Sequence, residues 1–350
     1  MKGRNFHANI PIFVPHKGCP HRCSFCDQRT IAGTGEAPSP AEAADLCRSA
    51  FLGLPPRFQK AEIAFFGGSF TAVPREEMTA LLEAVQPFRE DPRFGGIRVS
   101  TRPDAINEEI LQILENYGVR AIELGAQSLY NEVLEANGRG HKAEEVRQAA
   151  ELIRGKGFSL GLQMMTGLFQ STPERDWNTG LGLAALAPDT VRIYPTVVFP
   201  GTELARLMET GAYQPPGLPE TVELCARLLG MFEERGIRVI RLGLHGEPGV
   251  DQRALGGCFH PALGELCRSR LFLERILRWL ETEGKNKTPV VLVPPRLLSQ
   301  ALGQKRKNLT ELQRRWPGLT IRADAGIKED FLILYRDEER EEKQGGVVCG

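Results

Sequence analysis

Short apolar runs alternate with helical patterns along most of the chain. Strand-like segments fall at residues 10–14, 62–66, 97–100, 121–124, 159–165, 190–194 and 238–242. Apolar residues recur at helical spacing over residues 40–52, 75–85, 107–117, 144–154, 173–186 and 221–235. This alternation predicts an α/β fold built from right-handed βαβ units around a parallel sheet. The pattern alone leaves both a doubly wound sheet and a barrel open.

Glycine and proline mark the ends of the predicted strands, at Gly67, Gly68, Pro103, Gly125, Gly167 and Pro195. In a barrel, these carboxyl ends would carry the active site.

The pattern changes after Pro261. An amphipathic helix is predicted over residues 266–280, and a polar break follows it. A β-α-α-β-β order is then predicted over residues 290–293, 296–302, 309–316, 319–323 and 331–335. We therefore expect a barrel domain over residues 1–262, a helix with a small α+β module over residues 263–336, and a charged tail over residues 337–350.

Composition is that of an ordinary globular protein, with 41% hydrophobic and 25% charged residues. The 44 basic residues balance 44 acidic ones, so any nucleic-acid contact would need a local basic patch. No apolar run reaches the ~18 residues of a membrane span. The polar residues 1–10 do not have the pattern of a secretory signal. We expect a cytoplasmic location and no membrane partner.

Three of the eight cysteines lie within eight residues, as Cys19, Cys23 and Cys26. This C-x3-C-x2-C spacing indicates a metal site, because a disulfide framework would spread its cysteines through a short secreted chain. Three thiolates can hold three irons of a cubane cluster and leave the fourth iron open. Phe25 could shield such a cluster and offer an apolar face to a purine. Structural zinc, with His16 or His21 as fourth ligand, is the alternative, although such sites usually pair two separated knuckles.

The cysteine spacing, directly after a first strand, resembles that of the radical S-adenosylmethionine (SAM) superfamily. The resemblance implies a [4Fe-4S] cluster on Cys19, Cys23 and Cys26, with SAM chelating the open iron. It implies that one electron cleaves the S–C5′ bond of SAM to give a 5′-deoxyadenosyl radical, which takes a hydrogen atom from the substrate. A one-electron donor such as flavodoxin or ferredoxin is then expected as a partner.

Further segments extend the resemblance over residues 10–260. Residues 65–70 look like the superfamily's glycine-rich motif, which places Gly67, Gly68 and Ser69 near the methionine part of SAM. Together with residues 99–104, 123–128, 138–141 and 193–196, they resemble the radical SAM domain of the elongator catalytic subunit family, which modifies wobble uridine in tRNA. The resemblance implies a partial (β/α)6 TIM-type barrel.

The same match implies which side chains lie near SAM. It places Ser100, Gln127, Arg139 and Gln163 there, although Ser100 stands where an acidic residue is common in the family. Tyr194 is expected either on the substrate side or in the barrel wall.

The C-terminal segment departs from the elongator family. Residues 263–350 show no glycine loop that could cradle a pyrophosphate, so we do not expect them to supply acetyl-CoA. RNA, and tRNA in particular, is still the expected substrate. The alternatives are a radical SAM enzyme acting on a small molecule such as a porphyrinogen, and a non-enzymatic zinc-containing RNA-binding protein.

Residues 290–335 resemble a KH-type RNA-binding module, in which a G-x-x-G loop clamps a nucleotide backbone. The loop here is Gly303-Gln304-Lys305-Arg306, with arginine in place of the last glycine. Lys305, Arg306 and Lys307 are the expected RNA contacts. Arg314 and Arg315 add to the basic patch, and only Glu311 opposes it.

Overall fold

The computed structural model describes residues 6–15, 19, 22–26, 37–244, 250–282, 288–336 and 346–347. The chain forms two compact units. The first contains residues 1–221 and 232–261, and the second contains residues 222–231 and 262–350. In these described ranges, no helix is both long enough and apolar enough to cross a membrane.

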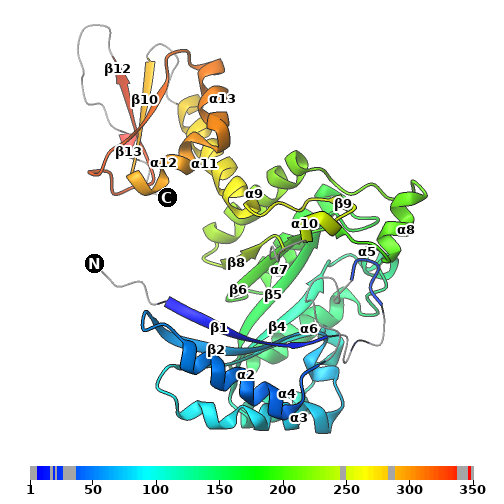
Figure 1. Ribbon diagram of the computed structural model, residues 1–350. Helices are drawn as coiled ribbons and strands as arrows, with labels where there is room; N and C mark the ends of the chain where they lie inside the picture. Colours follow the sequence, from blue (N-terminus) through cyan, green and yellow to red (C-terminus); the bar gives the residue numbers. More distant parts are fainter. Residues whose placement is uncertain are drawn as a thin grey trace. The chain divides into compact units, whose positions relative to one another are not determined.

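The first unit is built on a curled sheet of seven parallel strands (Figure 1). The strands are β1 (Phe6–Val14), β2 (Phe58–Gly67), β3 (Phe94–Thr101), β4 (Val119–Gln127), β5 (Ser159–Thr166), β6 (Thr190–Pro195) and β8 (Arg238–Leu242). They pair in chain order, which excludes a doubly wound sheet because that sheet reverses its strand order. The expected partial barrel is confirmed, with one strand more than the six of a (β/α)6 barrel.

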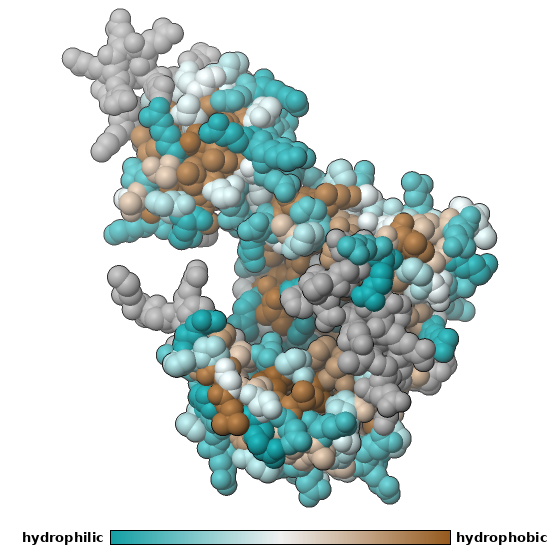
Figure 2. All heavy atoms as spheres, in the orientation of Figure 1, coloured by the Kyte–Doolittle hydropathy of each residue, from teal (hydrophilic) through white to brown (hydrophobic). Residues whose placement is uncertain are grey.

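Helices follow the strands and cover the convex side of the sheet. The longer ones are α2 (Pro40–Gly53), α3 (Arg75–Ala84), α4 (Glu108–Asn116), α6 (Ala143–Gly155) and α7 (Pro173–Ala185). The long helix α9 (Leu218–Glu234) precedes β8 in the chain, and its residues 222–231 belong to the second unit. Shorter elements at the carboxyl edge, which the sequence did not predict, are α5 (Asn131–Ala136), α8 (Glu203–Glu209), α10 (Val250–Arg253) and the paired strands β7 (Val197–Val198) and β9 (Gly256–Gly257). The helices at the bottom of the view turn a largely hydrophilic side outwards (Figure 2).

Side-chain alternation gives the sheet two different faces. Ile63 and Phe65 of β2 and Ile97 and Val99 of β3 point to the helix-covered side and are almost fully buried. Burying such a side chain contributes ~1.5–3 kcal/mol, so this face holds the barrel together. The residues between them, such as Glu62 and Arg98, point to the concave face. The helices therefore bury one apolar face, and charged side chains such as Glu62 and Arg98 lie on the concave face.

Strand β1 begins four residues earlier than the sequence pattern predicts. The expected strand spans residues 10–14, whereas the observed one starts at Phe6. Parallel pairing with β2 runs from Phe6 opposite Phe58 to Val14 opposite Gly67. Backbone pairing with β2 therefore extends the strand through residues 6–9.

The second unit packs α11 (Leu263–Thr282) and two shorter helices on a small sheet. Strand β10 (Thr288–Val293) leads through Pro295–Leu297 to α12 (Leu298–Leu302), and Gln304–Arg306 leads to α13 (Lys307–Arg315). Strands β11 (Thr320–Ala323), β12 (Leu332–Arg336) and β13 (Gly346–Val347) complete the sheet, in the order β11-β10-β12-β13. Ile276, Val291, Leu312 and Ile333 are fully buried at its centre.

The elements of this unit follow the β-α-α-β-β order expected from the sequence. Residues 337–345 and 348–350 of the expected charged tail lie outside the described residues. Gly346–Val347, in the middle of that segment, pairs antiparallel with β12.

Candidate active site

The three clustered cysteines lie in the loop that follows β1, at the carboxyl edge of the sheet. Cys19, Cys23 and Cys26 are each half-buried, and the Cys26 amide donates to the Cys23 carbonyl at 3.1 Å. Among the described residues, no three Cys, His, Asp or Glu side chains are grouped closely enough to hold a metal ion. His16 and His21, the alternative zinc ligands, lie outside the described residues. Whether the loop suits a cluster therefore depends on the groups that surround the thiols.

Two arginines surround the cysteine thiols. Arg139 Nη1 donates to Cys23 Sγ at 3.3 Å, and its Nε is buried without a hydrogen-bond partner in the described part of the chain. Burial raises the pKa of the Cys19 thiol and the neighbouring Cys23 thiol raises it further, while Arg102 and Arg139 oppose this shift. Neighbouring buried thiolates are stable only with compensating cations, which a metal cluster would add to the two guanidiniums. This donor set fits a thiolate-bound iron–sulfur cluster.

Asn137 ties the cysteine loop to the barrel. Its side-chain oxygen accepts a hydrogen bond from Ser24 Oγ at 2.6 Å, and its backbone carbonyl accepts one from the Ser24 amide at 3.1 Å. Its Nδ2 donates to the carbonyls of Val133 and Phe169 at 2.7 and 2.9 Å. Asn137 is fully buried, and the Ser24 carbonyl in turn accepts from the Leu204 amide at 2.9 Å, at the start of α8. These contacts fix the loop segment between Cys23 and Cys26.

The glycine-rich segment lies beside the same loop. Gly67 has φ +115°, and a Cβ there would lie 2.6 Å from the Phe13 ring, so only glycine fits. The Gly68 amide donates to the Val14 carbonyl at 2.7 Å. Ser69 is buried, and its hydroxyl accepts from the Arg102 amide at 3.0 Å. The segment is therefore held against the ends of β1 and β3.

Gln127, Gln163 and Arg139 come together at the ends of β4 and β5. Gln163 Nε2 donates to Gln127 Oε1 at 3.3 Å, and Arg139 Nη2 donates to the Gly125 carbonyl at 2.7 Å. Gln127 is buried with φ +63°, just after an irregularity in the β4–β5 pairing. Such left-handed backbone in a bulky residue is strained and often marks a functional position. Three of the four residues expected near SAM are thus neighbours.

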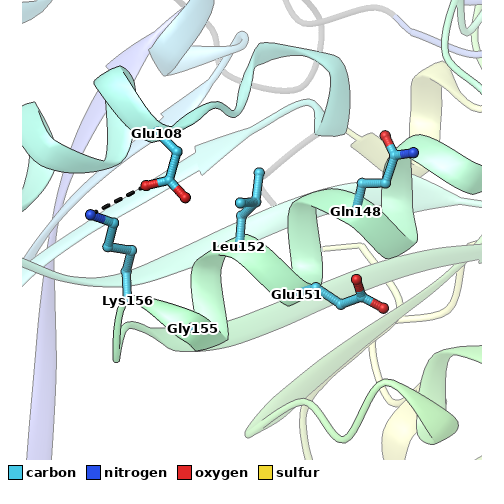
Figure 3. Close-up of a pocket in the computed structure, with 6 residues that line it drawn as sticks. All are labelled: Glu108, Gln148, Glu151, Leu152, Gly155 and Lys156. Atoms are coloured by element: carbon cyan, nitrogen blue, oxygen red, sulfur yellow. Dashed lines mark ion pairs between the residues drawn. The ribbon is translucent and has the colours of Figure 1, made fainter.

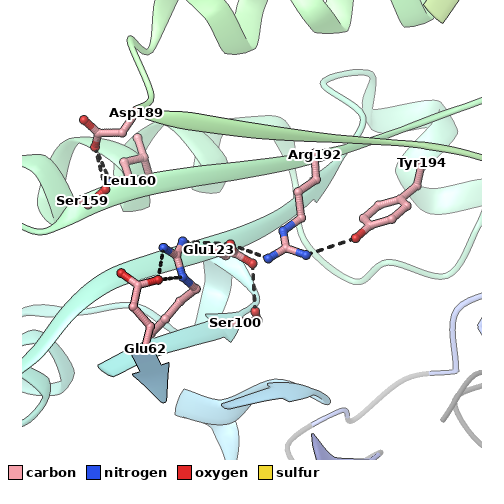
Figure 4. Close-up of polar contacts among 9 residues, drawn as sticks. Glu62, Ser100, Glu123, Ser159, Leu160, Asp189, Arg192 and Tyr194 are labelled. Carbon is pink, nitrogen blue, oxygen red and sulfur yellow. Dashed lines mark hydrogen bonds and ion pairs between the residues drawn. The ribbon is translucent and has the colours of Figure 1, made fainter. Parts of the chain in front are cut away.

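Ser100 is placed differently from those three residues. Its hydroxyl donates to Glu123 Oε2 at 3.3 Å, on the concave face of the sheet (Figure 4). Glu123 also accepts from Arg98 and Arg192, so Ser100 belongs to a charged array that the sequence did not predict.

Phe25 is half-buried and contacts two apolar clusters. One contains Val198, Leu204 and Tyr213, and the other contains Val133, Met165 and Leu168. The aromatic residue between the second and third cysteines therefore packs on the barrel through its ring.

His141 lies two residues after Arg139 and is buried. Its Nε2 donates to the Ala126 carbonyl at 3.3 Å, while Nδ1 has no partner among the described residues. Burial, with the neighbouring Arg139, lowers the pKa of His141 to about 4. A neutral imidazole at this position stabilises the fold above the ordinary pKa of about 6.5.

We predict a pH-dependent stability that His141 controls. The folded pKa lies below the unfolded one, so the stabilisation is present above pH 6.5 and is lost as pH falls towards 4. Across that window the loss is ~2–3 kcal/mol. Urea unfolding at pH 7 and pH 4.5 should show a smaller difference for His141→Gln than for the wild type. His260→Gln is the control, and an unchanged difference in His141→Gln would contradict the assignment.

A surface hollow of about 570 Å³ lies elsewhere on the first unit (Figure 3). It is lined by Glu108, Leu152 and Lys156 among others, and Lys156 Nζ pairs with Glu108 Oε2 at 3.2 Å. It lies between α4 and α6 in the outer layer, so it is no part of the site on the concave side.

Several residues of the site were not singled out from the sequence. They are Asn137, Arg102, Thr101, Glu123 and Arg192. Signals were present for three of them, because Thr101, Arg102 and Glu123 fall inside motifs at strand ends. Nothing in the sequence indicated the role of Asn137, whose partner Ser24 is 113 residues away.

A seven-stranded half-barrel with a cysteine loop at its carboxyl edge defines the class of this protein. The profile of the Radical SAM superfamily matches residues 13–178, and that of the Radical_SAM C-terminal domain matches residues 188–272. The chain therefore belongs to the radical SAM superfamily. This membership assigns it a [4Fe-4S] cluster and SAM as cofactors.

Similar proteins include a tRNA uridine(34) acetyltransferase of Methanocaldococcus jannaschii, 26% identical over 256 residues, which are 62% of this chain and 47% of that relative. Elongator complex protein 3 of Homo sapiens is 29% identical over 257 residues, which are 65% of this chain and 46% of that relative. The solved structure of Methanocaldococcus infernus Elp3 with an N-terminal deletion superposes with a TM-score of 0.60 at 22% identity, covering 79% of this chain and 63% of that one. The chain spans about half the length of the curated relatives it matches.

Proposed function

We propose that this protein is a radical SAM enzyme that modifies RNA, with tRNA as its substrate. The observation that carries the proposal is the anchored cysteine loop, with Arg139 on Cys23 at the carboxyl edge of the half-barrel. When bound, the cluster supplies the electron for reductive cleavage of SAM, which yields the radical that abstracts hydrogen from the substrate.

Cys19, Cys23 and Cys26 would hold the cluster in this proposal. Arg139 and Arg102 balance the thiolate charge, and Asn137 fixes the loop. The backbone of Gly67, Gly68 and Ser69 would meet the methionine part of SAM. Gln127, Gln163 and Arg139 would bind its polar groups, since they meet at the adjacent strand ends. Phe25 would cover the cofactors on the barrel side.

Two observations support tRNA as the substrate. The relatives reported above include a protein named tRNA uridine(34) acetyltransferase. The second unit, which we propose is a KH-like RNA-binding module, presents the exposed cations Lys305, Arg306 and Lys307 between α12 and α13.

The loop that carries these cations has an unusual backbone. Lys305 and Arg306 both have left-handed φ values, +52° and +61°, and the loop is held by buried Asn308, whose Nδ2 donates to the Ser269 carbonyl at 3.0 Å. Two nearby charges already form ion pairs with other residues. Arg315 pairs with Glu281, and Glu311 pairs with Arg270. Within the described residues, the cations at 305–307 have no acidic partner. They are therefore available to phosphates.

A direct test uses anaerobically reconstituted protein with SAM and dithionite. We expect a reducible iron–sulfur chromophore, 5′-deoxyadenosine, and a new nucleoside mass in tRNA isolated from a strain lacking the gene. A zinc protein without the chromophore would contradict the enzyme assignment. Release of 5′-deoxyadenosine with no change in any tRNA nucleoside would contradict the RNA substrate alone.

The basic loop makes a further prediction. Replacing Lys305, Arg306 and Lys307 by alanine should weaken tRNA binding and lower the slope of log Kd against log salt by ~2–3, because each lost phosphate contact contributes ~0.7–0.9. Filter binding between 50 and 200 mM salt measures this slope.

The matched control removes three exposed cations of the first unit, Arg48 of α2, Arg120 of β4 and Arg147 of α6, each replaced by alanine. Equal losses in the two triple variants would show only a general charge effect. An unchanged slope in the 305–307 variant would exclude this loop from the RNA interface.

A further inference from the structure

A chain of charged side chains crosses the concave face of the half-barrel (Figure 4). Arg98 Nη2 donates to Glu62 at 2.7 Å, and its Nη1 donates to Glu123 at 3.0 Å. Arg192 Nη2 donates to Glu123 at 2.8 Å, and its Nη1 donates to Tyr194 Oη at 3.4 Å. These residues come from strands β2, β3, β4 and β6, and β5 lies between the last two. We call this set the concave array.

The hydrogen-bonding capacity of the array is used fully at its centre, Glu123, and only in part at its Arg192–Tyr194 end. Glu123 is 7% exposed and accepts from Arg98, Arg192 and Ser100, so its oxygens are well satisfied. Arg192 Nε, in contrast, is buried with no partner among the described residues. Tyr194 Oη accepts a bond from Arg192, but no described residue accepts its own proton. The Arg192–Tyr194 end therefore has hydrogen-bond donors to spare.

This open end lies beside the residues proposed to hold the cofactors. The Tyr194 ring contacts the apolar cluster of Val133, Met165 and Leu168, which Phe25 of the cysteine loop also contacts. On the adjacent strand, Gln163 stands opposite Arg192 in the register. The array thus runs across the concave face from β2 to β6, and its Tyr194 end shares an apolar cluster with Phe25 of the cysteine loop.

We infer that Arg192 and Tyr194, held by Glu123, form a subsite that binds a neutral carbonyl oxygen of the substrate base. This inference rests on the proposed function and names residues for its substrate side. Two arginines and two glutamates make the array neutral, so a carbonyl acceptor, such as those of a pyrimidine, suits it better than a full anion. Arg192 and Tyr194 act here as positioning residues for the base. The SAM carboxylate is the other source of acceptor oxygens, and the test separates the two.

Tyr194→Phe removes only the hydroxyl and keeps the ring in its apolar cluster. We expect the KM for tRNA to rise about 10-fold, as for loss of one hydrogen bond. We also expect more 5′-deoxyadenosine per modified nucleoside. When the base is mispositioned, the 5′-deoxyadenosyl radical takes its hydrogen atom from elsewhere and no modification follows. The Kd for SAM and the cluster absorbance should not change. Arg192→Lys keeps the charge but loses the planar donors of the guanidinium. It should raise the KM for tRNA, and the ratio of 5′-deoxyadenosine to modified nucleoside, more than Tyr194→Phe does.

Tyr117→Phe, at the C-terminus of α4 in the outer layer, is the matched control. If the Tyr194 and Arg192 variants weaken SAM binding and leave the KM for tRNA unchanged, the subsite belongs to SAM and the inference is wrong. Variants indistinguishable from the wild type would also overturn it. Thermal unfolding of each variant separates these outcomes from misfolding.

A second measurement tests the subsite independently of the proposed RNA substrate. If the wild type cleaves SAM but modifies no tRNA, the proposed RNA substrate fails. Ligand-observed NMR with uridine then tests the subsite directly. Uridine binding that Tyr194→Phe abolishes would support the subsite, and absence of binding to the wild type would refute it.

Discussion

Alanine at Cys23 is expected to abolish both the iron–sulfur chromophore and SAM cleavage. Cys23 is the thiol that Arg139 contacts, at 3.3 Å, and it lies beside Cys19. A cubane cluster held by three thiolates loses a third of its protein ligands in this variant. The effect should exceed the ~10–100-fold that loss of an outer-shell partner costs at metal sites. Iron content, the visible absorbance of the cluster and the yield of 5′-deoxyadenosine are the measurements.

Cys47→Ala provides the control for this change. Cys47 lies inside α2, fully buried, and burial raises the pKa of its thiol to about 12. A thiol of this kind packs as a small hydrophobic group, so iron loading should stay at the wild-type level. Equal iron content in the Cys23 and Cys47 variants would refute the cluster site on the loop after β1.

Asn137→Ala is expected to give the second-largest effect, although Asn137 is not among the residues proposed to hold the cofactors. The side chain makes three hydrogen bonds in a fully buried place, to Ser24, Val133 and Phe169. Alanine leaves these groups unpaired, so we expect a loss of ~2–4 kcal/mol in the free energy of unfolding. Because Ser24 lies between Cys23 and Cys26, we also expect faster iron loss to a chelator.

Asn116→Ala is the matched control, since Asn116 is an exposed asparagine at the end of α4. Urea unfolding gives the stability change, and a chelator time course at constant temperature gives the rate of iron loss. If Asn137→Ala loses stability but retains iron as firmly as the wild type, Asn137 supports the barrel only. The assigned role in holding the cysteine loop would then be wrong.

Most strands and helices of the first unit could be predicted, because each depends on a local sequence pattern. The glycines that end residues 62–66 and the alternation over residues 97–100 predicted two of the strands, and Ile63, Phe65, Ile97 and Val99 in them are buried. Helix α4 carries its own start and stop signals, with the Asn107 side chain accepting from the Ile110 amide and Gly118 following at φ +75°. The boundaries were less predictable, as β1 shows, because a neighbouring strand decides where pairing stops.

The cofactor side of the site was predictable only in part. The spacing of Cys19, Cys23 and Cys26 indicated cluster chemistry, and motif order led to Gln127, Arg139 and Gln163, which the fold brings together. Ser100 was expected beside SAM as well. Ser100 contacts Glu123 because it lies on the concave face of β3, opposite Glu123 of β4. Residues near Ser100 in the sequence do not determine this pairing.

The sequence by itself determined the order of strands and helices and the cysteine spacing, since each depends on residues a few positions apart. Only the tertiary structure decided that Asn137 holds Ser24 and that Glu123 lies between Arg98 and Arg192. It also decided the left-handed backbone at Gln127. These features require residues from separate strands and loops to meet, and curling of the sheet brings them together.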